Sequence, residues 1–144
     1  VQEDSLRISW KKGHESQFYW QADVPADFSQ MEQDGGALVM EFMINKYPKG
    51  SVTQRMDCGW PCRGEIDVTE FYKSIPLRQR SKVGISLSCF KKMGVDMEKI
   101  TSPLVLVSKD EFEITFSDVR VIANASEDNT IQLCDSEVAT LLQD

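Results

Sequence analysis

The chain has 144 residues, of which 41% are hydrophobic and 27% are charged, a composition typical of one folded domain rather than a disordered chain. Its formal net charge of −7 argues against nucleic acid and anionic membrane surfaces as partners, because both are themselves negative. The longest apolar stretches, such as 37–40 and 104–107, are far shorter than the about 20 residues of a membrane-spanning helix. Because the sequence opens at Val1 without an initiator methionine or a signal peptide, we expect a processed product or a piece of a longer protein.

Apolar and polar residues alternate along much of the chain, and this period of two predicts strands with one buried face. The predicted strands, in chain order, are 6–10, 18–24, 38–45, 52–58, 83–89, 104–107 and 112–116. Turn-forming Gly, Pro and Asp residues separate them. Short strands at such regular spacing predict an all-β, antiparallel β-sandwich.

Helical structure is predicted only as short turns. Ser29 with Glu32, and Asp67 with Glu70, have the spacing of a capping box, in which two residues three apart satisfy the free backbone groups of a helix start. The predicted helical turns cover 28–33, 69–75 and 96–100.

The alternating pattern fades near the C-terminus. We therefore predict a β-sandwich accessory domain over 1–123 and a C-terminal tail over 124–144. The stretch 138–142 has the composition of a short helix, and the alternatives for the tail are packing on the sandwich or a loose chain.

The predicted strand that begins at Phe112 contains a break in its phase. Continuing the count from Phe116 would point Asp118 inward, yet Val119 and Val121 have the character of core residues. A bulge at Ser117–Asp118 would reset the register. The alternative is that Asp118 points inward and binds a structural calcium ion together with a carboxylate of Glu3 or Asp4, because an unpaired buried carboxylate costs several kcal/mol.

Four cysteines allow three full pairings. A disulfide between Cys58 and Cys62 would close a tight loop and hold Trp60 in place, which implies an oxidising compartment. A zinc site is disfavoured because the sequence lacks a C-x-x-C pair and has one histidine. Cys89 lies on the inward phase of a predicted strand and is expected to be a buried free thiol, whereas the state of Cys134 stays open.

Glu65, Asp67 and Glu70 resemble the E-I-D-x-x-E signature of family-16 glycoside hydrolases. In that family the first Glu is the nucleophile, the Asp tunes it and the last Glu is the acid/base, so the resemblance implies these roles here. Retaining glycosidases need two carboxyl groups about 5–5.5 Å apart, which a bulged strand can provide. The match covers about a dozen residues, and Glu70 also fits a capping box, so a small endo-glucanase is kept as the alternative function.

A second resemblance covers most of the chain, from residue 3 to roughly 134. The ordered motifs that carry it are Glu3-Asp4, Ile8-Ser9-Trp10, Val24 to Ser29, Gly36 to Val39, Cys58-Gly59-x-x-Cys62, Asp67-Val68-Thr69, Leu87-Ser88-Cys89-Phe90, Gly94-x-Asp96, Ser117 to Arg120 and Cys134. Together they resemble the C-terminal galactose-binding-like domain of bacterial family-3 glycoside hydrolases, the exo-β-glucanase and β-glucosidase-like enzymes.

This resemblance implies a jelly-roll sandwich that follows a barrel domain and an α/β domain, which together contain the active site. The chain by itself would then be no enzyme and would require no cofactor. Its implied partners are the catalytic domains of the same polypeptide and a β-glucan or oligosaccharide. The implied location of the parent enzyme is the bacterial periplasm or the extracellular space.

Neutral glycans are bound by hydrogen-bonding side chains together with exposed aromatic rings. Outward positions of the predicted strands supply polar groups, provided that these strands are neighbours, and nearby aromatic residues supply rings. The candidate ligand-binding residues are Trp60, Tyr47, Arg55, Asp57, Glu41 and Tyr72. The simpler alternative is that these are solvated outward positions and that the domain docks on the catalytic domains or braces them.

Overall fold

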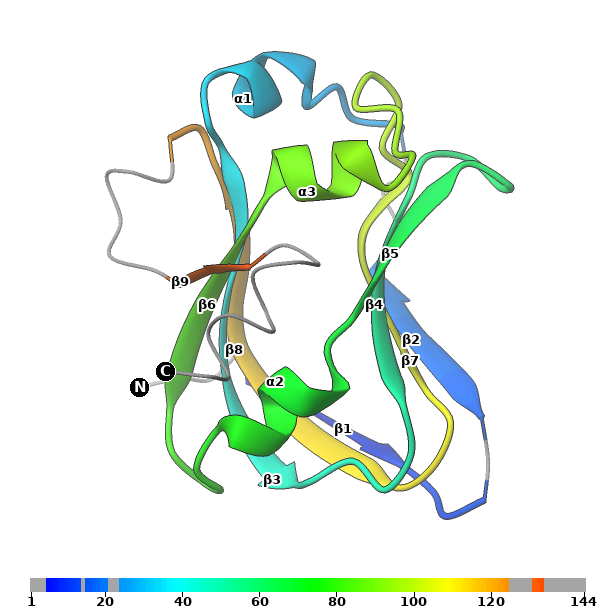
Figure 1. The fold of residues 1–144 in the computed structure, drawn as a ribbon, viewed down its shortest axis with the longest axis vertical. Helices are drawn as coiled ribbons and strands as arrows, with labels where there is room; N and C mark the ends of the chain where they lie inside the picture. The colour runs from blue at the N-terminus through cyan, green and yellow to red at the C-terminus, as the bar shows by residue number, and fades with distance from the viewer. Residues whose placement is uncertain (1–4, 14, 21–23, 125–130, 134–144) are drawn as a thin grey trace.

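Two β-sheets face each other in the computed structural model, which describes residues 5–13, 15–20, 24–124 and 131–133 (Figure 1). The strands are β1 (Leu6–Trp10), β2 (Ser16–Trp20), β3 (Ala37–Lys46), β4 (Val52–Asp57), β5 (Arg63–Asp67), β6 (Ser81–Ser86), β7 (Ser102–Ser108), β8 (Phe112–Ile122) and β9 (Ile131–Leu133). The helices are α1 (Ser29–Gln33), α2 (Thr69–Ser74) and α3 (Leu87–Lys92). The predicted all-β sandwich with short helical turns is confirmed.

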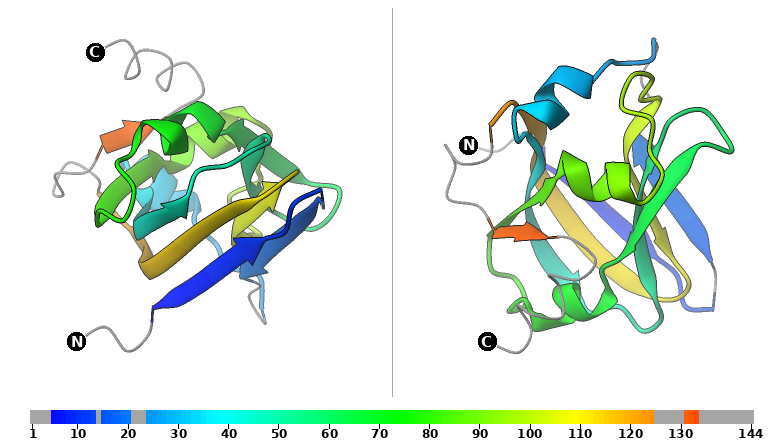
Figure 2. Two further views of the ribbon diagram at one scale, coloured as in Figure 1. Left: turned by 90° about the horizontal axis from the view of Figure 1, so that it is seen from below. Right: turned by 45° about the horizontal axis from the view of Figure 1, so that its top comes forward.

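Within the described residues, one sheet has the strand order β1-β8-β3-β6-β9 and the other has the order β2-β7-β4-β5. All of these pairs are antiparallel except the pair of β6 with the short β9. The consecutive strands β1 and β2 lie at the edges of different sheets (Figure 2). The chain therefore passes from one sheet to the other directly after its first strand. The described helices are too short and too polar to span a membrane.

The core lies between the sheets because the inward positions of the strands are apolar. On β3, Phe42 and Ile44 are at most 1% exposed, and the residues opposite them on β8, Phe116 and Ile114, are at most 2% exposed. Burying one such side chain contributes about 1.5–3 kcal/mol to folding, so the alternating pattern fixes which face of each strand points inward.

The helices α2 and α3 close opposite ends of the space between the sheets (Figure 1). The helix α2 buries Phe71 and Tyr72, and α3 buries Leu87 and Phe90, all in the same core. Each helix thus contributes apolar side chains to the layer that the two sheets enclose.

The start of α2 differs from the predicted capping box. One carboxylate oxygen of Asp67 accepts hydrogen bonds from the backbone N–H and the hydroxyl of Thr69, two residues further on. Asp27 makes the same pair of contacts with Ser29 at the start of α1. These local bonds between an aspartate and the backbone begin both helices.

The predicted bulge in β8 is confirmed. Glu41 pairs with Asp118 while the next residue, Phe42, pairs with Phe116, so Ser117 has no opposite residue on β3. The extra residue reverses the phase of the strand, and Val119 packs against the core as a result.

Three sequence-based expectations are wrong in their details. The predicted strand over 83–89 ends at Ser86, whose hydroxyl accepts the backbone N–H of Ser88 and so caps α3. Cys89 therefore lies on a helix, and it is disulfide-bonded rather than a free thiol. The strand predicted over 18–24 does not extend to Val24, which lies in a bend and is 75% exposed.

The predicted turn over 96–100 is present, and no helix forms there. The strand β5 is not among the predicted strands. The short β9 lies in the segment predicted as a tail. The helix predicted over 138–142 and the cysteine at 134 lie outside the described residues.

We predict that the substitution Gly36→Ala lowers the free energy of unfolding by about 1–3 kcal/mol. A methyl group there would lie 2.5 Å from the carbonyl oxygen of Ile122 and 2.8 Å from that of Met31, and backbone atoms cannot move aside cheaply. Urea denaturation measures the change. The control is Gly50→Ala, whose methyl group would meet a side-chain carbon of Asp110 at 3.1 Å and should cost clearly less; equal losses would contradict the packing argument.

Candidate functional site

A disulfide-closed loop joins β4 to β5. Cys58 and Cys62 are bonded, with their α-carbons 5.0 Å apart, as the sequence predicted. Two backbone hydrogen bonds stay inside the loop, from the Cys58 N–H to the Cys62 carbonyl (2.9 Å) and from the Cys62 N–H to the Gly59 carbonyl (2.8 Å). A third bond ties the loop to the segment before β7, because the Gly59 N–H donates to the hydroxyl of Thr101 at 3.1 Å. The loop is thus fixed to the sheet at both of its ends.

The loop presents Trp60, whose side chain is 69% exposed. The guanidinium carbon of Arg63 lies 4.4 Å from the centroid of the Trp60 ring, and that of Arg55 lies 5.4 Å from it. Both distances are within the range of cation–π attraction, which contributes about 0.5–1 kcal/mol at an exposed site. Arg63 also donates to the carbonyl of Pro61 at 2.9 Å, so the indole has a defined position although most of it faces solvent.

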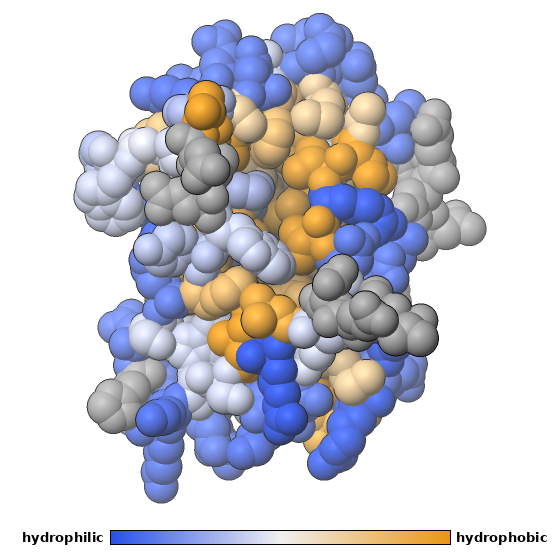
Figure 3. All heavy atoms as spheres, turned by 180° about the vertical axis from the view of Figure 1, so that it is seen from behind, coloured by the Kyte–Doolittle hydropathy of each residue, from blue (hydrophilic) through white to orange (hydrophobic). Residues whose placement is uncertain are grey.

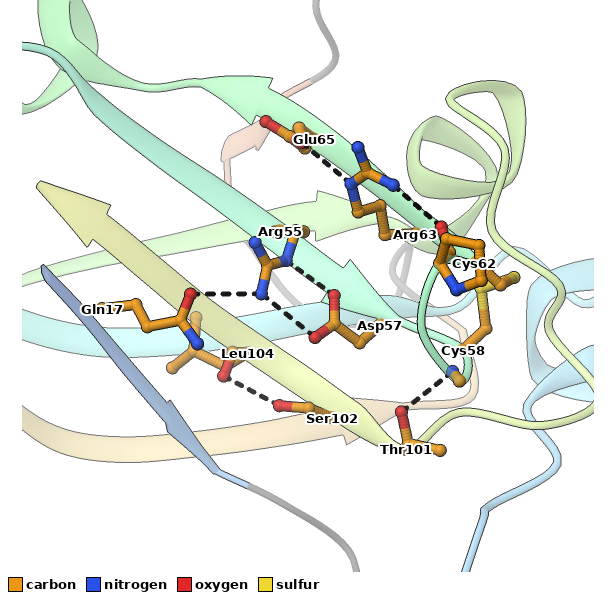
Figure 4. A network of polar contacts seen from close by, with 12 residues as sticks. Gln17, Arg55, Asp57, Cys58, Cys62, Arg63, Glu65, Thr101, Ser102 and Leu104 are labelled. Atoms are coloured by element: carbon orange, nitrogen blue, oxygen red, sulfur yellow. Dashed lines mark hydrogen bonds and ion pairs between the residues drawn. A yellow bond between two sulfur atoms is a disulfide. The ribbon is translucent and has the colours of Figure 1, made fainter.

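An ion pair lies next to this loop on the outer face of β4. Arg55 and Asp57 are two residues apart on the strand, so their side chains point to the same face. Nε of Arg55 donates to Oδ1 of Asp57 at 2.7 Å, and Nη2 donates to Oδ2 at 3.2 Å. The side chains are only 11% and 18% exposed. Nη2 of Arg55 also donates to the Oε1 atom of Gln17 on β2, at 3.4 Å, which links the two strands (Figure 4).

The register of the sheet explains why residues from distant parts of the sequence meet here. Tyr19 on β2 lies opposite Val105 on β7, which lies opposite Arg55 on β4, which lies opposite Glu65 on β5. Because residues in register across antiparallel strands point to the same face, this row runs along the outside of the four-stranded sheet. Tyr19, at 48% exposure, therefore stands on the same face as Arg55.

These groups line one pocket of about 340 Å³, a size in the range of small-molecule sites. Its lining residues are Gln17, Tyr19, Arg55, Asp57, Gly59, Trp60, Thr101 and Ser102. Two exposed aromatic rings thus border a set of hydrogen-bonding side chains. We call this cavity the Trp60 pocket.

The Trp60 pocket brings together three of the six candidate ligand-binding residues, namely Trp60, Arg55 and Asp57. The sequence analysis missed the contribution of β2 and of the segment before β7. The sequence does indicate that Tyr19 points outward, because it alternates with the inward-facing Phe18. It does not indicate which strands lie beside β2, so the position of Tyr19 next to Arg55 could not be predicted.

The other three candidates lie elsewhere. Tyr72 is fully buried in the core against Phe42 and Phe112, where burial raises the pKa of its hydroxyl far above the ordinary value, so it cannot serve as an exposed platform. The hydroxyl of Tyr47 donates to the carbonyl of Ile75 at 2.7 Å, which holds that ring against the core.

Glu41 lies on β3 in the five-stranded sheet and binds Arg120 at 2.9 Å. The condition that the strands carrying Glu41 and Arg55 are neighbours is therefore not met, because β4 belongs to the other layer.

The carboxylates of the glucanase alternative have separate structural partners. Glu65 binds Arg63 at 3.3 Å, Asp67 caps the start of α2, and Glu70 on α2 lies 3.8 Å from Lys73. None of the three lines the Trp60 pocket.

The calcium hypothesis involved Asp118, Glu3 and Asp4. Asp118 is exposed and forms an ion pair with Arg120, whereas Glu3 and Asp4 lie outside the described residues. Among the described residues, no group of three His, Cys, Asp or Glu side chains is placed to hold a metal ion. A structural calcium ion therefore stays a prediction.

A second pocket, of about 330 Å³, opens elsewhere and has a more apolar lining. It is formed by Leu6, Trp20, Pro103, Phe116, Ser117, Asp118 and Val119, which come from strands of both sheets. Seen from behind, the molecule shows apolar side chains gathered in the middle of its surface, with hydrophilic residues around them (Figure 3). We call this cavity the edge pocket, because β1 and β2 are edge strands.

Several solved structures share this fold. The extra C-terminal domain of an exo-1,3/1,4-β-glucanase from a Pseudoalteromonas species superimposes with a TM-score of 0.72 at 20% identity, covering 91% of this chain and 69% of that one. In the structure of that exo-glucanase itself, the match covers 92% of this chain but 15% of the enzyme, with a TM-score of 0.74 and 21% identity.

The family 30 carbohydrate-binding module of a cellulosomal cellulase from Clostridium thermocellum gives a TM-score of 0.66 at 17% identity and covers 82% of this chain and 73% of that one. No curated protein sequence matches the chain.

The fold is therefore that of the galactose-binding-like β-sandwiches. A family model for these domains, Exop_C, described as galactose-binding domain-like, matches residues 1–121. The chain belongs to the Exop_C family.

We predict that the purified chain releases no reducing sugar from mixed-linkage β-glucan or cellulose oligomers during prolonged incubation. Retaining hydrolysis needs two carboxyl groups about 5–5.5 Å apart around one sugar, and the three candidates serve separate contacts. A reducing-sugar assay on the wild type and on the Glu65→Gln variant checks this. Release by the wild type that the variant loses would restore the glucanase alternative.

Proposed function

We propose that this chain is a carbohydrate-binding accessory domain of a glucan-degrading glycoside hydrolase and that glycan binds in the Trp60 pocket. The observation that carries this proposal is the pairing of exposed rings with polar groups. Trp60 and Tyr19 offer apolar surfaces to the C–H faces of a sugar ring, while Arg55, Asp57 and Gln17 offer hydrogen bonds to its hydroxyl edge. A pyranose presents these two kinds of surface and needs both to be matched.

The proteins to which the similar structures belong support the proposal. One belongs to a β-glucanase and another is a carbohydrate-binding module. The parent protein would supply the catalytic domains, since the chain spans only 15% of the similar exo-glucanase. The disulfides at Cys58–Cys62 and at Cys89 support a secreted or periplasmic location, because such bonds persist in oxidising compartments.

A second candidate role is docking on the catalytic domains of the same polypeptide. The edge pocket favours it, because Leu6 and Trp20 remain 39% and 36% exposed there beside apolar neighbours. The two roles use different surfaces and can coexist in one domain.

We predict that Trp60→Ala and Tyr19→Ala each weaken glycan binding by at least about tenfold, which corresponds to about 1.4 kcal/mol. Each substitution removes one apolar wall of the pocket without touching the core. Affinity electrophoresis in gels containing β-glucan measures the effect as lost retardation.

The matched control is Val24→Ala, which shortens an apolar side chain that is 75% exposed and does not line the pocket. This variant should migrate like the wild type. A wild-type chain that no tested glucan retards would contradict carbohydrate binding and leave docking as the better proposal.

A further inference from the structure

The charges in the Trp60 pocket and directly beside it are balanced within the protein itself. Arg55 is neutralised by Asp57 through two hydrogen bonds, and Arg63 by Glu65 at 3.3 Å. A ligand carrying carboxylate or sulfate groups would have to compete with these carboxylates for the guanidinium groups. The net charge of −7 further opposes the approach of an anion. The electrostatics of this pocket therefore favour an uncharged ligand.

The Arg55–Asp57 pair is also held in place before any ligand arrives. Its side chains are 11% and 18% exposed, and Gln17 anchors the guanidinium from β2. Separating the pair would leave a largely desolvated charge without its partner, which is costly. The pair is consequently a fixed feature of the pocket floor that a ligand must match as it stands.

Hydrogen-bonding capacity remains on both members of the pair. Among the described residues, the Nη1 atom of Arg55 donates to no acceptor, and each Asp57 oxygen accepts one hydrogen bond from Arg55. A carboxylate oxygen can accept more than one bond. The pair thus keeps one unused donor on Arg55 and unused acceptor capacity on Asp57, both of which a ligand can engage.

We propose that the ligand is a neutral glycan and that the Arg55–Asp57 pair binds a vicinal diol of one sugar unit; this inference rests on the proposed carbohydrate binding. One hydroxyl accepts from Nη1 of Arg55 while its neighbour donates to the Asp57 carboxylate. The guanidinium carbon of Arg55 is 5.4 Å from the Trp60 ring centroid, so a ring bound by its hydroxyl edge has its apolar face beside the indole.

The diol requirement separates two classes of β-glucan that have the same composition and charge. Every unit of a β-1,4-linked glucan keeps adjacent free hydroxyls at C2 and C3. Internal units of a β-1,3-linked glucan have no adjacent pair, because the linkage occupies C3, so a β-1,3-linked oligomer keeps adjacent hydroxyls in its terminal units alone. The inferred ligand class is therefore neutral glycan with β-1,4 linkages or another linkage that spares the diol.

Isothermal titration of the full chain with cellohexaose, laminarihexaose and a β-1,4-linked oligoglucuronate tests this inference. We expect cellohexaose to bind at least about tenfold more tightly than laminarihexaose, as the loss of a hydrogen bond to a charged group would give. The oligoglucuronate should bind more weakly than cellohexaose. Affinity for cellohexaose should change less than about twofold between about 0.05 and 0.5 M NaCl, because a neutral ligand is not screened.

Two carboxylate-to-amide variants provide the matched comparison. Asp57→Asn should weaken binding of cellohexaose at least about tenfold and bring the two hexasaccharides to similar affinities. Glu41→Gln makes the same chemical change at an Arg-bound carboxylate of the opposite sheet and should leave both affinities unchanged. If Asp57→Asn unfolds, the charge-neutral double variant Arg55→Gln/Asp57→Asn takes its place, with circular dichroism to verify the fold.

The outcomes separate this inference from the proposed function. Equal affinity for cellohexaose and laminarihexaose that Asp57→Asn leaves unchanged and Trp60→Ala abolishes would overturn the diol inference while carbohydrate binding stands. Tighter, salt-sensitive binding of the oligoglucuronate would overturn neutrality. Failure of all three ligands to bind would overturn the proposed function together with the inference.

Discussion

The burial of alternate side chains between two sheets is the constraint on which the Trp60 pocket depends. Once Phe18 and Met56 point into the core, the residues beside them must point outward. Antiparallel pairing then determines which outward residues are neighbours, and it aligns Tyr19, Arg55 and Glu65 in one row although 46 positions separate the first from the last. A slip of one residue in any of these strands would disperse the row and expose the core.

The disulfide-closed loop adds rigidity where the sheet ends. Strand pairing fixes Arg55 and Asp57, but it does not extend to Trp60, which lies beyond the end of β4. The bond between Cys58 and Cys62, together with the hydrogen bond to Thr101, limits the motion of this segment. An aromatic ring whose position is set in advance loses less conformational entropy on binding, so the loop raises affinity without any additional contact.

Sequence periodicity predicted the sandwich, most strands and the bulge at Ser117, because one-sided burial leaves a period of two. It failed where short segments fit two patterns. Leu87 and Cys89 alternate like strand residues, yet the cap provided by Ser86 favours the helix α3. It also failed for strand order, since the sequence of β3 carries no information about which sheet it joins, and Glu41 was consequently grouped with Arg55.

The glucanase-like motif shows how a short match can reflect local structure. The segment 65–70 is the point at which β5 turns into α2. An outward carboxylate beside Arg63, an Asp that accepts the first free N–H of a helix and a Glu in its first turn are each favourable for that transition. The three residues thus have sufficient structural reasons to be acidic, and catalysis would require in addition that they face one substrate. In this fold the hydrogen-bonding groups that do face one cavity belong to the row containing Arg55, and that cavity lacks a second carboxylate beside Asp57 among its lining residues. Retaining cleavage needs two carboxyl groups about 5–5.5 Å apart around one sugar, whereas binding needs only matched rings and hydrogen-bonding groups, and the described lining of this pocket matches the second requirement.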